Sequence, residues 1–568
     1  MKLPKLLLVL ATSAALSTTA VAQNMHIEQL ANDNALMRIS QNETAKYLLL
    51  PIEEKSPEAE VKVIVNNDLV RTLNIRLALN KVDYYVPFLL DEFRGKDLKL
   101  LTHLNIDRSN GRGAQSEICW SKIHLSNTFD TTNKEKFRPK FHHTPKYAWM
   151  NDPNGMFYLN GEWHLYYQYG PYGSMWNNMT WGHSVSRDLI NWEHRPDAIK
   201  PDALGAIFSG SCVVDHNNTA GFGKGAVIAL YTSAGDVQSQ SLAYSTDGGN
   251  TFTKYDGNPI LTADIIDFRD PNMFWNEDIN AWNLILSHGQ DMMIFSSPDL
   301  KNWTHESTFG TGLGGHGGVW ECPDLMKLKV ENGKHKGQEK WVLYCNINPG
   351  GPNGGSATQY FIGDFDGHKF TVDDESRYTG GNSLWQDYGK DHYATVSFSN
   401  APDGRHTMIA WMSNWEYAND VPTMQFRSAN SICREPFLYE GADKQLYLGS
   451  RPSPEYEGKG LDQVVQLKGA CKVVLSNDEG EEYVLTYDPK AMTLTADRSK
   501  SGLVEFNQNF ITAGTKGITP IEAPLHNKLT SLRIFIDASS VEVFGNNGEV
   551  CITNLVFPQS KYNHITIK

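Results

Sequence analysis

The sequence predicts an all-β protein: a five-bladed β-propeller followed by a C-terminal β-sandwich, with an extra small N-terminal β-sandwich-like module. Two observations predict this fold. A Ser-x-Asp motif followed by an aromatic residue recurs at Asp188, Asp247 and Asp299, with a weaker copy at Asp366. The copies lie about 50 to 70 residues apart, which suits four-stranded propeller blades. The last part of the chain holds a second set of short strand-like runs without this motif.

The limits of the predicted domains follow from where these patterns start and stop. Residues 136–448 contain the repeats and are predicted to form the propeller, and residues 449–568 the C-terminal sandwich. Residues 23–135 contain strand-like runs broken by polar turns, among them Ile118–Leu125, and are predicted to form an accessory module. Neither flanking module shows a convergent carboxylate or Cys/His cluster. The chemistry is therefore expected in the central segment.

Residues 1–22 have the three parts of a secretory signal peptide. Lys2 and Lys5 form the charged start, Leu6–Leu10 the apolar core, and Ala20-Val21-Ala22 the small-residue cleavage site. The sequence therefore predicts export with cleavage after this triplet, to the periplasm or the medium.

The composition narrows the partners and cofactors. A formal net charge of −14 argues against nucleic acid or an anionic membrane as the partner. No later run reaches the ~18 apolar residues of a membrane span, so no membrane anchor is expected. The 7 cysteines are scattered and contain no Cys-x-x-Cys pair. This predicts no metal site and no cofactor, and mostly buried free thiols with at most one bridge.

A stiff turn is predicted near the start of the propeller, at Asp-Pro-Asn-Gly (152–155). It precedes two aromatic-rich runs joined by Asn160-Gly161, the dipeptide most typical of a β-hairpin. The carboxylate of Asp152 is thereby expected at the mouth of a sheet.

Carboxylates recur where successive predicted blades begin. The blades are predicted to open at Asn151-Asp152, Phe208–Ser211, Arg269-Asp270, Trp320-Glu321 and Asp387–Asp391. Corresponding points of successive blades surround one channel, so Asp152, Asp270 and Glu321 are expected to meet at one end of it. The alternative is that each acid is a turn residue that hydrogen-bonds its own backbone.

Three convergent carboxyl groups suit the hydrolysis of a glycosidic bond. This reaction needs one ionised carboxylate and one protonated acid, and a third acid can bind hydroxyls or stabilise positive charge. Arg269 can hydrogen-bond sugar hydroxyls or neutralise one of the acids. The predicted surroundings offer amide, hydroxyl and indole groups, although each tryptophan can equally be a core residue: Gln168, Trp176, Trp181, Ser209, Trp320 and Trp415.

Four motifs give the sequence a family resemblance. Trp-Met-Asn-Asp-Pro-Asn-Gly (149–155), Phe-Ser-Gly-Ser (208–211), Phe-Arg-Asp-Pro (268–271) and Trp-Glu-Cys-Pro (320–323) together resemble glycoside hydrolase family 32, the invertase, inulinase and levanase group. The resemblance covers roughly residues 140–568. It implies a five-bladed propeller with a β-sandwich, and a retaining attack on the anomeric carbon of a β-fructofuranoside.

The resemblance also implies roles for individual residues. Asp152 resembles the nucleophile, Glu321 the acid/base and Asp270 the transition-state stabiliser. Cys322 either tunes the pKa of the acid/base or is a passive packing thiol. The residues implied to hold the terminal fructosyl unit are Asn151, Gln168, Trp176, Phe208, Ser209, Arg269 and Trp415.

The expected activity is that of a retaining exo-β-fructosidase, which works through a fructosyl-enzyme intermediate. The segments 387–394 and 411–418 are similar to those of exo-acting inulinases and levanases. Release of terminal fructose from levan or inulin is therefore expected, with sucrose as a lesser substrate. The alternatives are an endo-levanase, an invertase, or a catalytically silent fructan-binding propeller. The last is disfavoured because all three carboxylates are present.

Overall fold

The computed structural model describes residues 24–31, 33–106, 117–131, 135–512 and 520–568. The predicted signal peptide lies outside these residues and stays a prediction. The described chain is nearly all β, with one four-residue α-helix, α1 (Cys119–Lys122). It divides into two compact units. The first holds the described residues up to 131 with 171–178 and 201–203, and the second holds the remainder.

The first unit contains two antiparallel sheets around one apolar core. One sheet has the strand order β1-β2-β7-β4-β5 and the other β6-β3-β8. Buried side chains of both sheets, including Leu48, Val63 and Leu100, form the core. The strands are β1 (Met25–Gln29), β2 (Asn34–Ile39), β3 (Tyr47–Ile52), β4 (Ala59–Val65), β5 (Asp68–Ile75), β6 (Tyr84–Leu89), β7 (Leu98–His103) and β8 (His124–Ser126).

The strand predicted at Ile118–Leu125 is wrong in its first half, which forms helix α1 before the short strand β8. The backbone N–H of Ile123 donates to the carbonyl of Cys119, and the hydroxyl of Ser121 donates to the carbonyl of Ile118. These local bonds close a helical turn, and they override the strand preference of the two isoleucines.

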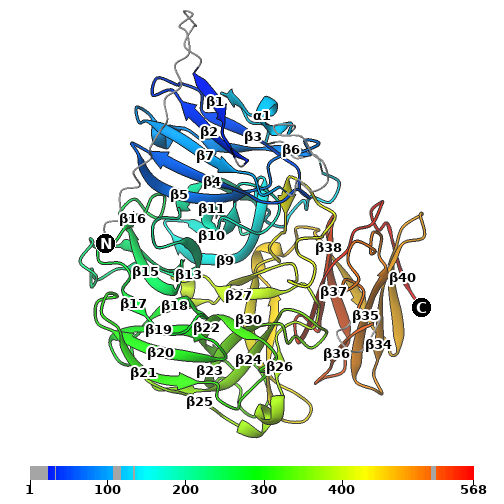
Figure 1. Cartoon of the computed structure of the whole chain (residues 1–568). Helices are drawn as coiled ribbons and strands as arrows, with labels where there is room; N and C mark the ends of the chain where they lie inside the picture. Colours follow the sequence, from blue (N-terminus) through cyan, green and yellow to red (C-terminus); the bar gives the residue numbers. More distant parts are fainter. Residues whose placement is uncertain (1–23, 32, 107–116, 132–134, 513–519) are drawn as a thin grey trace, which may run out of the picture. The chain divides into compact units, whose positions relative to one another are not determined.

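The first part of the second unit contains five mainly antiparallel sheets that follow one another along the chain (Figure 1). Their strand orders are β12-β11-β10-β9-β29, β13-β14-β15-β16 with β17 beside β15, β18-β19-β20-β21, β22-β23-β24-β25 with β26 beside β24, and β27-β28-β30-β31. The strands of the first two sheets are β9 (Ala148–Leu159), β10 (Glu162–Gly170), β11 (Thr180–Ser186), β12 (Trp192–Ile199), β29 (Phe426–Arg427), β13 (Ala206–Asp215), β14 (Ala226–Ala234), β15 (Gln238–Ser245), β16 (Thr253–Lys254) and β17 (Leu261–Thr262). Those of the other three are β18 (Phe268–Asn276), β19 (Ala281–His288), β20 (Asp291–Ser297), β21 (Thr304–Phe309), β22 (Val319–Lys329), β23 (Glu339–Asn348), β24 (Ala357–Phe365), β25 (Phe370–Val372), β26 (Leu384–Trp385), β27 (Tyr393–Ser397), β28 (Met408–Trp411), β30 (Arg434–Glu440) and β31 (Leu446–Pro452).

The first strands of these five sheets contact one another in a repeating order. β9 contacts β13, β13 contacts β18, β18 contacts β22, β22 contacts β27, and β27 contacts β9. The first sheet is completed from far along the chain, because Phe426 and Arg427 of β29 pair in parallel with Ala148 and Trp149 of β9. The fifth sheet begins at Tyr393, two residues after the end of its predicted opening at Asp387–Asp391.

The Ser-x-Asp repeat has a local physical cause. In the first sheet, Asp188 lies in the turn between the third and fourth strands, β11 and β12. Its carboxylate accepts hydrogen bonds from the Ser186 hydroxyl and from the backbone N–H groups of Ile190 and Asn191. Asp247 and Asp299 hold the corresponding turns of the next two sheets in the same way. The motif therefore marks one fixed point in each of the first three sheets.

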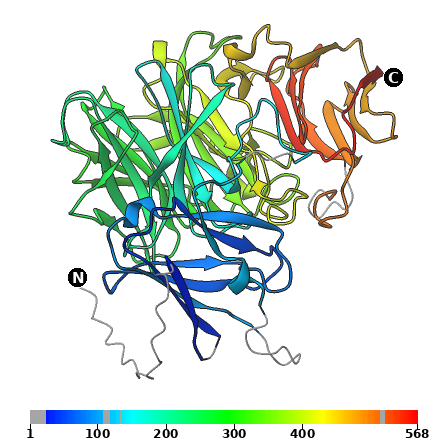
Figure 2. The ribbon, with the colours of Figure 1, turned by 90° about the horizontal axis from the view of Figure 1, so that it is seen from above.

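The C-terminal part of the second unit consists of two facing sheets, drawn in orange and red in Figures 1 and 2. Their strand orders are β32-β37-β38-β39 and β36-β35-β34-β33-β40. One apolar core, which includes Leu485, Leu494 and Ile534, receives side chains from both. The strands are β32 (Asp462–Gln466), β33 (Cys471–Ser476), β34 (Glu482–Asp488), β35 (Thr493–Lys500), β36 (Ile521–Pro524), β37 (Ser531–Ile536), β38 (Ser540–Gly545), β39 (Val550–Leu555) and β40 (His564–Ile567).

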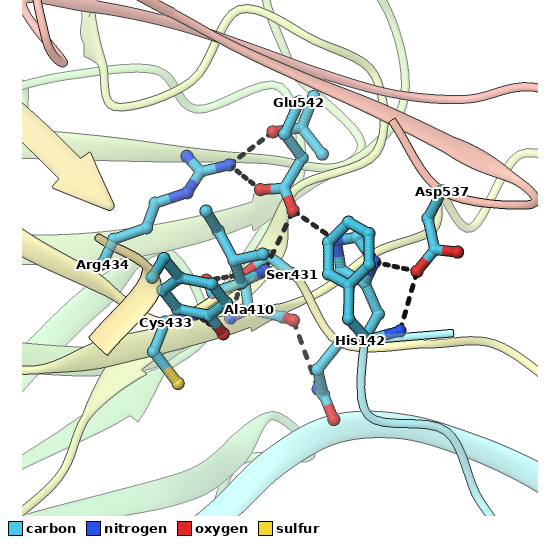
Figure 3. Close-up of polar contacts among 12 residues, drawn as sticks. His142, Ala410, Ser431, Cys433, Arg434, Asp537 and Glu542 are labelled. Carbon is cyan, nitrogen blue, oxygen red and sulfur yellow. Dashed lines mark hydrogen bonds and ion pairs between the residues drawn. The ribbon is translucent and has the colours of Figure 1, made fainter. Parts of the chain in front are cut away.

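A buried ionic network joins the C-terminal sheets to the fifth sheet. Figure 3 shows the part of it around Arg434, Glu542, His142 and Asp537. Arg434 of β30 donates from Nη1 to Asp387 at 2.8 Å and from Nη2 to Glu542 of β38 at 2.5 Å. His142 lies 2.8 Å from Glu542 through Nε2 and 2.9 Å from Asp537 through Nδ1. Because both ring nitrogens face carboxylates, the imidazole is doubly protonated and positively charged. The network thus sets two cations among three carboxylates.

We expect the second unit to lose stability as the pH rises from about 6.5 to 9. Burial alone would lower the pKa of His142, but hydrogen bonds to Asp537 and Glu542 raise it to about 9. Its contribution, at most about 3 kcal/mol, is therefore complete below the unfolded value near 6.5 and lost as the pH rises through 9. Thermal unfolding measured between pH 5 and 10 follows this fall in stability. In His142→Gln the stability should depend less on pH over this range, and an unchanged dependence contradicts the assignment.

Two general features of the described residues bear on the sequence predictions. All 7 cysteines are free, and only Cys471 is not buried, as the scattered pattern predicted. None of the helices in the described ranges has the length and apolar character needed to cross a membrane.

Candidate active site

The segment Asp-Pro-Asn-Gly, predicted to be a turn, is instead a bulged part of strand β9. Register shifts interrupt the pairing of β10 with β9 on either side of Tyr166 and Tyr167, opposite this segment. Gly155 has φ 50°, and a Cβ there would lie 2.6 Å from the Trp181 ring, so glycine is required on both grounds. The hairpin at Asn160-Gly161 is confirmed, with φ values of 53° and 87°.

Similar bulges occur near the start of the first strand in the other sheets. Pairing shifts register at Ile207–Gly210, Arg269–Asn272, Glu321–Asp324 and Tyr393–Val396. Within these bulges, Asp270 and Cys322 have φ values of 66° and 40°, which are unusual for residues other than glycine. A bulge re-aims side chains that would otherwise alternate between the two faces of a sheet. The irregular backbone therefore directs these side chains toward a common site.

Asp152 has one oxygen held by neighbours and one that is not. The Ser209 hydroxyl donates to Oδ2 at 3.0 Å, and the Cys322 sulfur lies 3.8 Å from the same atom. Oδ1 is buried and has no hydrogen-bond partner among the described residues. Burial, followed by the negative charge of Glu321, raises the pKa of Asp152 to about 6. Asp152 is thus an ionisable carboxylate with an uncommitted oxygen.

Asp270 is almost fully buried, with 5% of its surface exposed. Its Oδ2 accepts a hydrogen bond from the backbone N–H of Cys322 at 2.9 Å, and its own N–H donates to the Thr232 hydroxyl. Burial raises the pKa of Asp270 to about 7, with the charge of Arg269 opposing and that of Glu321 reinforcing the rise. The carboxyl group is held firmly by backbone contacts.

Both carboxylate oxygens of Glu321 accept hydrogen bonds. Arg269 donates from Nε and Nη2 to Oε1, at 3.1 and 3.0 Å, and the Tyr393 hydroxyl donates to Oε2. Arg269 also lies 4.0 Å from Oδ2 of Asp270. Of the two interpretations of Arg269, these contacts favour pairing with the acids.

Cys322 connects two of the three acids. Its sulfur lies 3.6 Å from Oδ2 of Asp270 and 3.8 Å from Oδ2 of Asp152. Burial, and then the charges of Asp270 and Asp152, raise the pKa of the thiol well above its usual value. The thiol therefore stays protonated and acts as a weak donor between the two carboxylates.

The structure brings together Asp152, Asp270 and Glu321, and it places Ser209 and Arg269 in direct contact with them. Asn151 accepts a hydrogen bond from the Trp149 indole at 2.7 Å, and Trp415 stacks on the same indole with 5.9 Å between ring centroids. Two further candidates contact their neighbours: the carbonyl of Phe208 accepts from the indole of Trp181, and the side chain of Gln168 donates to Asn154.

Trp176 belongs to the segment 171–178 that forms part of the first unit, and its side chain is partly exposed. The predicted contact of Trp176 with a fructosyl unit therefore stays a prediction.

Sequence reasoning missed Tyr393, which is buried and directly hydrogen-bonded to Glu321. The signal is present in the sequence, because Tyr393 lies two residues after the predicted opening at Asp387–Asp391 and within the segment 387–394. Placing the opening of the fifth predicted blade at Asp387–Asp391 left the tyrosine just outside it. The register of the bulge at Tyr393, which aims the side chain inward, is a property of the backbone pairing.

The site has the groups for glycosidic bond cleavage. Within the described residues, no group of three or more His, Cys, Asp or Glu side chains could hold a metal ion. A pair of carboxyl groups, here Asp152 with an uncommitted oxygen and Glu321 held by Arg269 and Tyr393, is what most glycosidases use.

Comparison with sequence families identifies the class. Residues 142–450 match the Glycosyl hydrolases family 32 N-terminal domain, and residues 465–568 match the Glycosyl hydrolases family 32 C terminal domain. Residues 31–141 match a family described only as a domain of unknown function, DUF4980. The fold, the carboxylate cluster and these matches define a glycoside hydrolase. The chain belongs to glycosyl hydrolase family 32, which confirms the resemblance.

Individual relatives agree with this membership. A levanase of Bacillus subtilis (strain 168) is 43% identical over 463 residues, which cover 75% of this chain and 67% of the relative. An extracellular exo-inulinase of Aspergillus awamori is 35% identical over 504 residues, covering 77% and 92%. The solved structure of β-fructofuranosidase from Schwanniomyces occidentalis, complexed with fructosyl-erythritol, superposes with a TM-score of 0.68 at 34% identity, covering 78% and 96%.

Proposed function

We propose that this glycoside hydrolase is a retaining exo-β-fructosidase that releases terminal fructose from levan or inulin, with sucrose as a lesser substrate. The single observation that carries the proposal is the Asp152 carboxylate, whose buried Oδ1 has no hydrogen-bond partner among the described residues and lies beside the Asp270–Glu321 cluster. Levanase and exo-inulinase relatives support the choice of fructan as substrate.

In the first step, Oδ1 of Asp152 attacks the anomeric carbon of the terminal fructosyl unit. The bond from that carbon to the leaving oxygen breaks, and Glu321 gives this oxygen its proton. Asp270, whose Oδ2 accepts from the N–H of Cys322, has the role of stabilising the positive charge that develops on the sugar. The step leaves a fructosyl ester on Asp152 and a shortened chain.

In the second step, Glu321 takes a proton from water as the water oxygen attacks the same anomeric carbon. The ester bond to Asp152 breaks, fructose leaves, and both carboxyl groups return to their starting protonation states. Two inversions give net retention. The Arg269 and Tyr393 contacts keep the Glu321 carboxyl group in one orientation for both proton transfers.

The architecture and export belong to the same proposal. The five sheets are five blades of one closed propeller (136–448), a reading supported by the repeating contacts of β9, β13, β18, β22 and β27. The accessory module is 23–135 and the C-terminal sandwich 449–568. Export after cleavage of residues 1–22 is supported by relatives named as extracellular exo-inulinases.

Product analysis tests the proposal directly. We expect incubation with levan, inulin and sucrose to release fructose from the first moments, with no intermediate oligosaccharides, when the products are separated by chromatography. A ladder of oligosaccharides would show endo action instead. Turnover of sucrose alone would indicate an invertase, and binding of fructan without any product would indicate a silent binding protein.

We expect Ser209→Ala to move the acidic limb of the kcat/KM profile to higher pH. Activity should fall as the pH falls through about 6, because attack needs ionised Asp152. The Ser209 hydroxyl stabilises that ionised form through its hydrogen bond to Oδ2, so removing it raises the pKa further. The pH profile of the variant decides the matter, and a limb that stays in place or moves to lower pH contradicts this account.

Tyr393→Phe should lower kcat/KM by about 10-fold to 100-fold. The change removes only the hydroxyl group that orients Glu321, at a cost of roughly 1 to 3 kcal/mol. Steady-state kinetics with sucrose and inulin measure the loss. Tyr456→Phe, which removes another buried hydroxyl at a distance from the acids, is the control for general packing effects. Equal losses in the two variants would show that the Tyr393 hydroxyl has no specific role in orienting Glu321.

A further inference from the structure

Two loops beside the carboxylate cluster each expose a large aliphatic side chain. Val237, in the hairpin between β14 and β15, is 63% exposed, and Ile266, just before β18, is 79% exposed. Among the exposed large apolar residues in the described ranges, these two have the highest values. Single exposed aliphatic side chains are common on proteins, so exposure alone does not indicate a binding surface.

Val237 and Ile266 each come directly before a residue that hydrogen-bonds Arg269. Gln238, next to Val237, accepts from Nη1 of Arg269 at 3.1 Å and also from the backbone N–H of Phe268. Asp267, next to Ile266, accepts from the same Nη1 at 2.6 Å. The two loops therefore converge on one nitrogen of Arg269, whose other nitrogens hold Glu321.

Backbone bonds tie the second loop to the strand that carries Glu321. Gly289 donates its N–H to the carbonyl of Asp267 at 2.8 Å, and Trp320 donates its N–H to the carbonyl of Gly289 at 2.8 Å. Ile265 already packs against the apolar core of this region. The neighbouring Ile266 is thus presented outward on a fixed loop, and its exposure is not a failure of packing.

We propose that Val237 and Ile266, together called the rim patch, form an apolar contact surface for the sugar units on the leaving-group side of a fructan chain. The inference rests on the proposed function, in which Glu321 protonates the leaving oxygen. The two loops are linked to Glu321 through Arg269, so we expect them on the side of the site where the leaving part of the fructan chain lies.

The chemistry of the rim patch fits a neutral carbohydrate. Sugar rings present C–H faces to apolar side chains and hydroxyl groups to acceptors. Val237 follows the exposed Asp236, and Ile266 lies between Asp264 and Asp267, so carboxylates that can accept from hydroxyl groups flank both aliphatic side chains. The same carboxylates disfavour an acidic partner.

The proposal predicts an effect that grows with substrate length. Val237→Ser combined with Ile266→Ser should lower kcat/KM for long-chain inulin and levan about fivefold to tenfold, since apolar contact area is lost. Sucrose, with a single sugar beyond the scissile bond, should change less than twofold. The trisaccharide and tetrasaccharide of the inulin series should fall in between. Equal losses on sucrose and polysaccharide, or no loss on polysaccharide, would overturn the proposal.

A matched control and a binding measurement complete the test. Val464 of β32, in the C-terminal sheets, is 61% exposed, so Val464→Ser repeats the chemical change away from the site and should leave all rates unchanged.

Migration in gels containing inulin or levan, with Asp152→Asn in every protein, measures binding without turnover. The rim-patch variant should be retarded less than its parent, and equal retardation counts against the patch. If the unaltered enzyme releases no fructose from fructan, the proposed function fails, while this gel still decides the inference.

Discussion

Asp152→Asn should lower kcat about 10⁴-fold or more, because the amide cannot form the covalent intermediate while every other part of the site remains. The same change should stabilise the fold near neutral pH. Burial and Glu321 raise the pKa of Asp152 to about 6, so ionisation of this carboxyl group costs folding stability as the pH rises from about 4 to 6. An uncharged asparagine avoids that cost.

Stopped and steady-state assays with sucrose and inulin, alongside thermal unfolding at pH 7, measure both effects. Asp299→Asn is the matched control, because Asp299 is a turn carboxylate of the repeat and its replacement should leave kcat within twofold. A variant at Asp152 that keeps more than a tenth of the activity would rule out nucleophilic attack by this residue.

Arg434→Met should lower the free energy of unfolding of the second unit by about 3 to 5 kcal/mol. The change leaves Asp387 and Glu542 buried with one of their cations removed, and an uncompensated buried charge is strongly destabilising. The long apolar methionine keeps most of the packing over Phe544, so lost volume contributes little. Denaturant and thermal midpoints measure the effect.

The control for this prediction is Arg451→Met. Arg451 also pairs with a glutamate, Glu331, and also lies over an aromatic ring, but both ionic partners are substantially exposed to water. Exposed pairs contribute at most about 1 kcal/mol, so the midpoint should barely move. A similar loss in both variants would mean that burial of the network has no special energetic role.

Patterns with a local physical cause were predictable from the sequence. The repeat at Asp188, Asp247 and Asp299 marked the sheets because each carboxylate holds a turn at the same place. The three acids followed from the position of each sheet's first strand. The strand-like runs of the C-terminal sheets were equally clear. Side chains of β34 and β35 alternate between buried and less buried positions, whereas β37, β38 and β39 are largely buried on both faces.

Features set by long-range pairing were not predictable in the same way. The bulges that turn Asp270 and Cys322 depend on the register between neighbouring strands. Asp-Pro-Asn-Gly has the composition of a turn, yet pairing with β10 draws it into a strand. His142 and Glu542 are about 400 positions apart, so no local pattern indicated that they meet.

The parallel pairing of β29 with β9 has a consequence for synthesis of the protein. Ala148, close before Asp152, is paired with Phe426, and its backbone N–H donates to the carbonyl of Gln425. A nascent chain that has emerged from the ribosome as far as residue 400 therefore carries all three acids but cannot finish the sheet on which the first one stands. Catalytic competence should appear late in translation, and fragments ending before residue 426 should be inert.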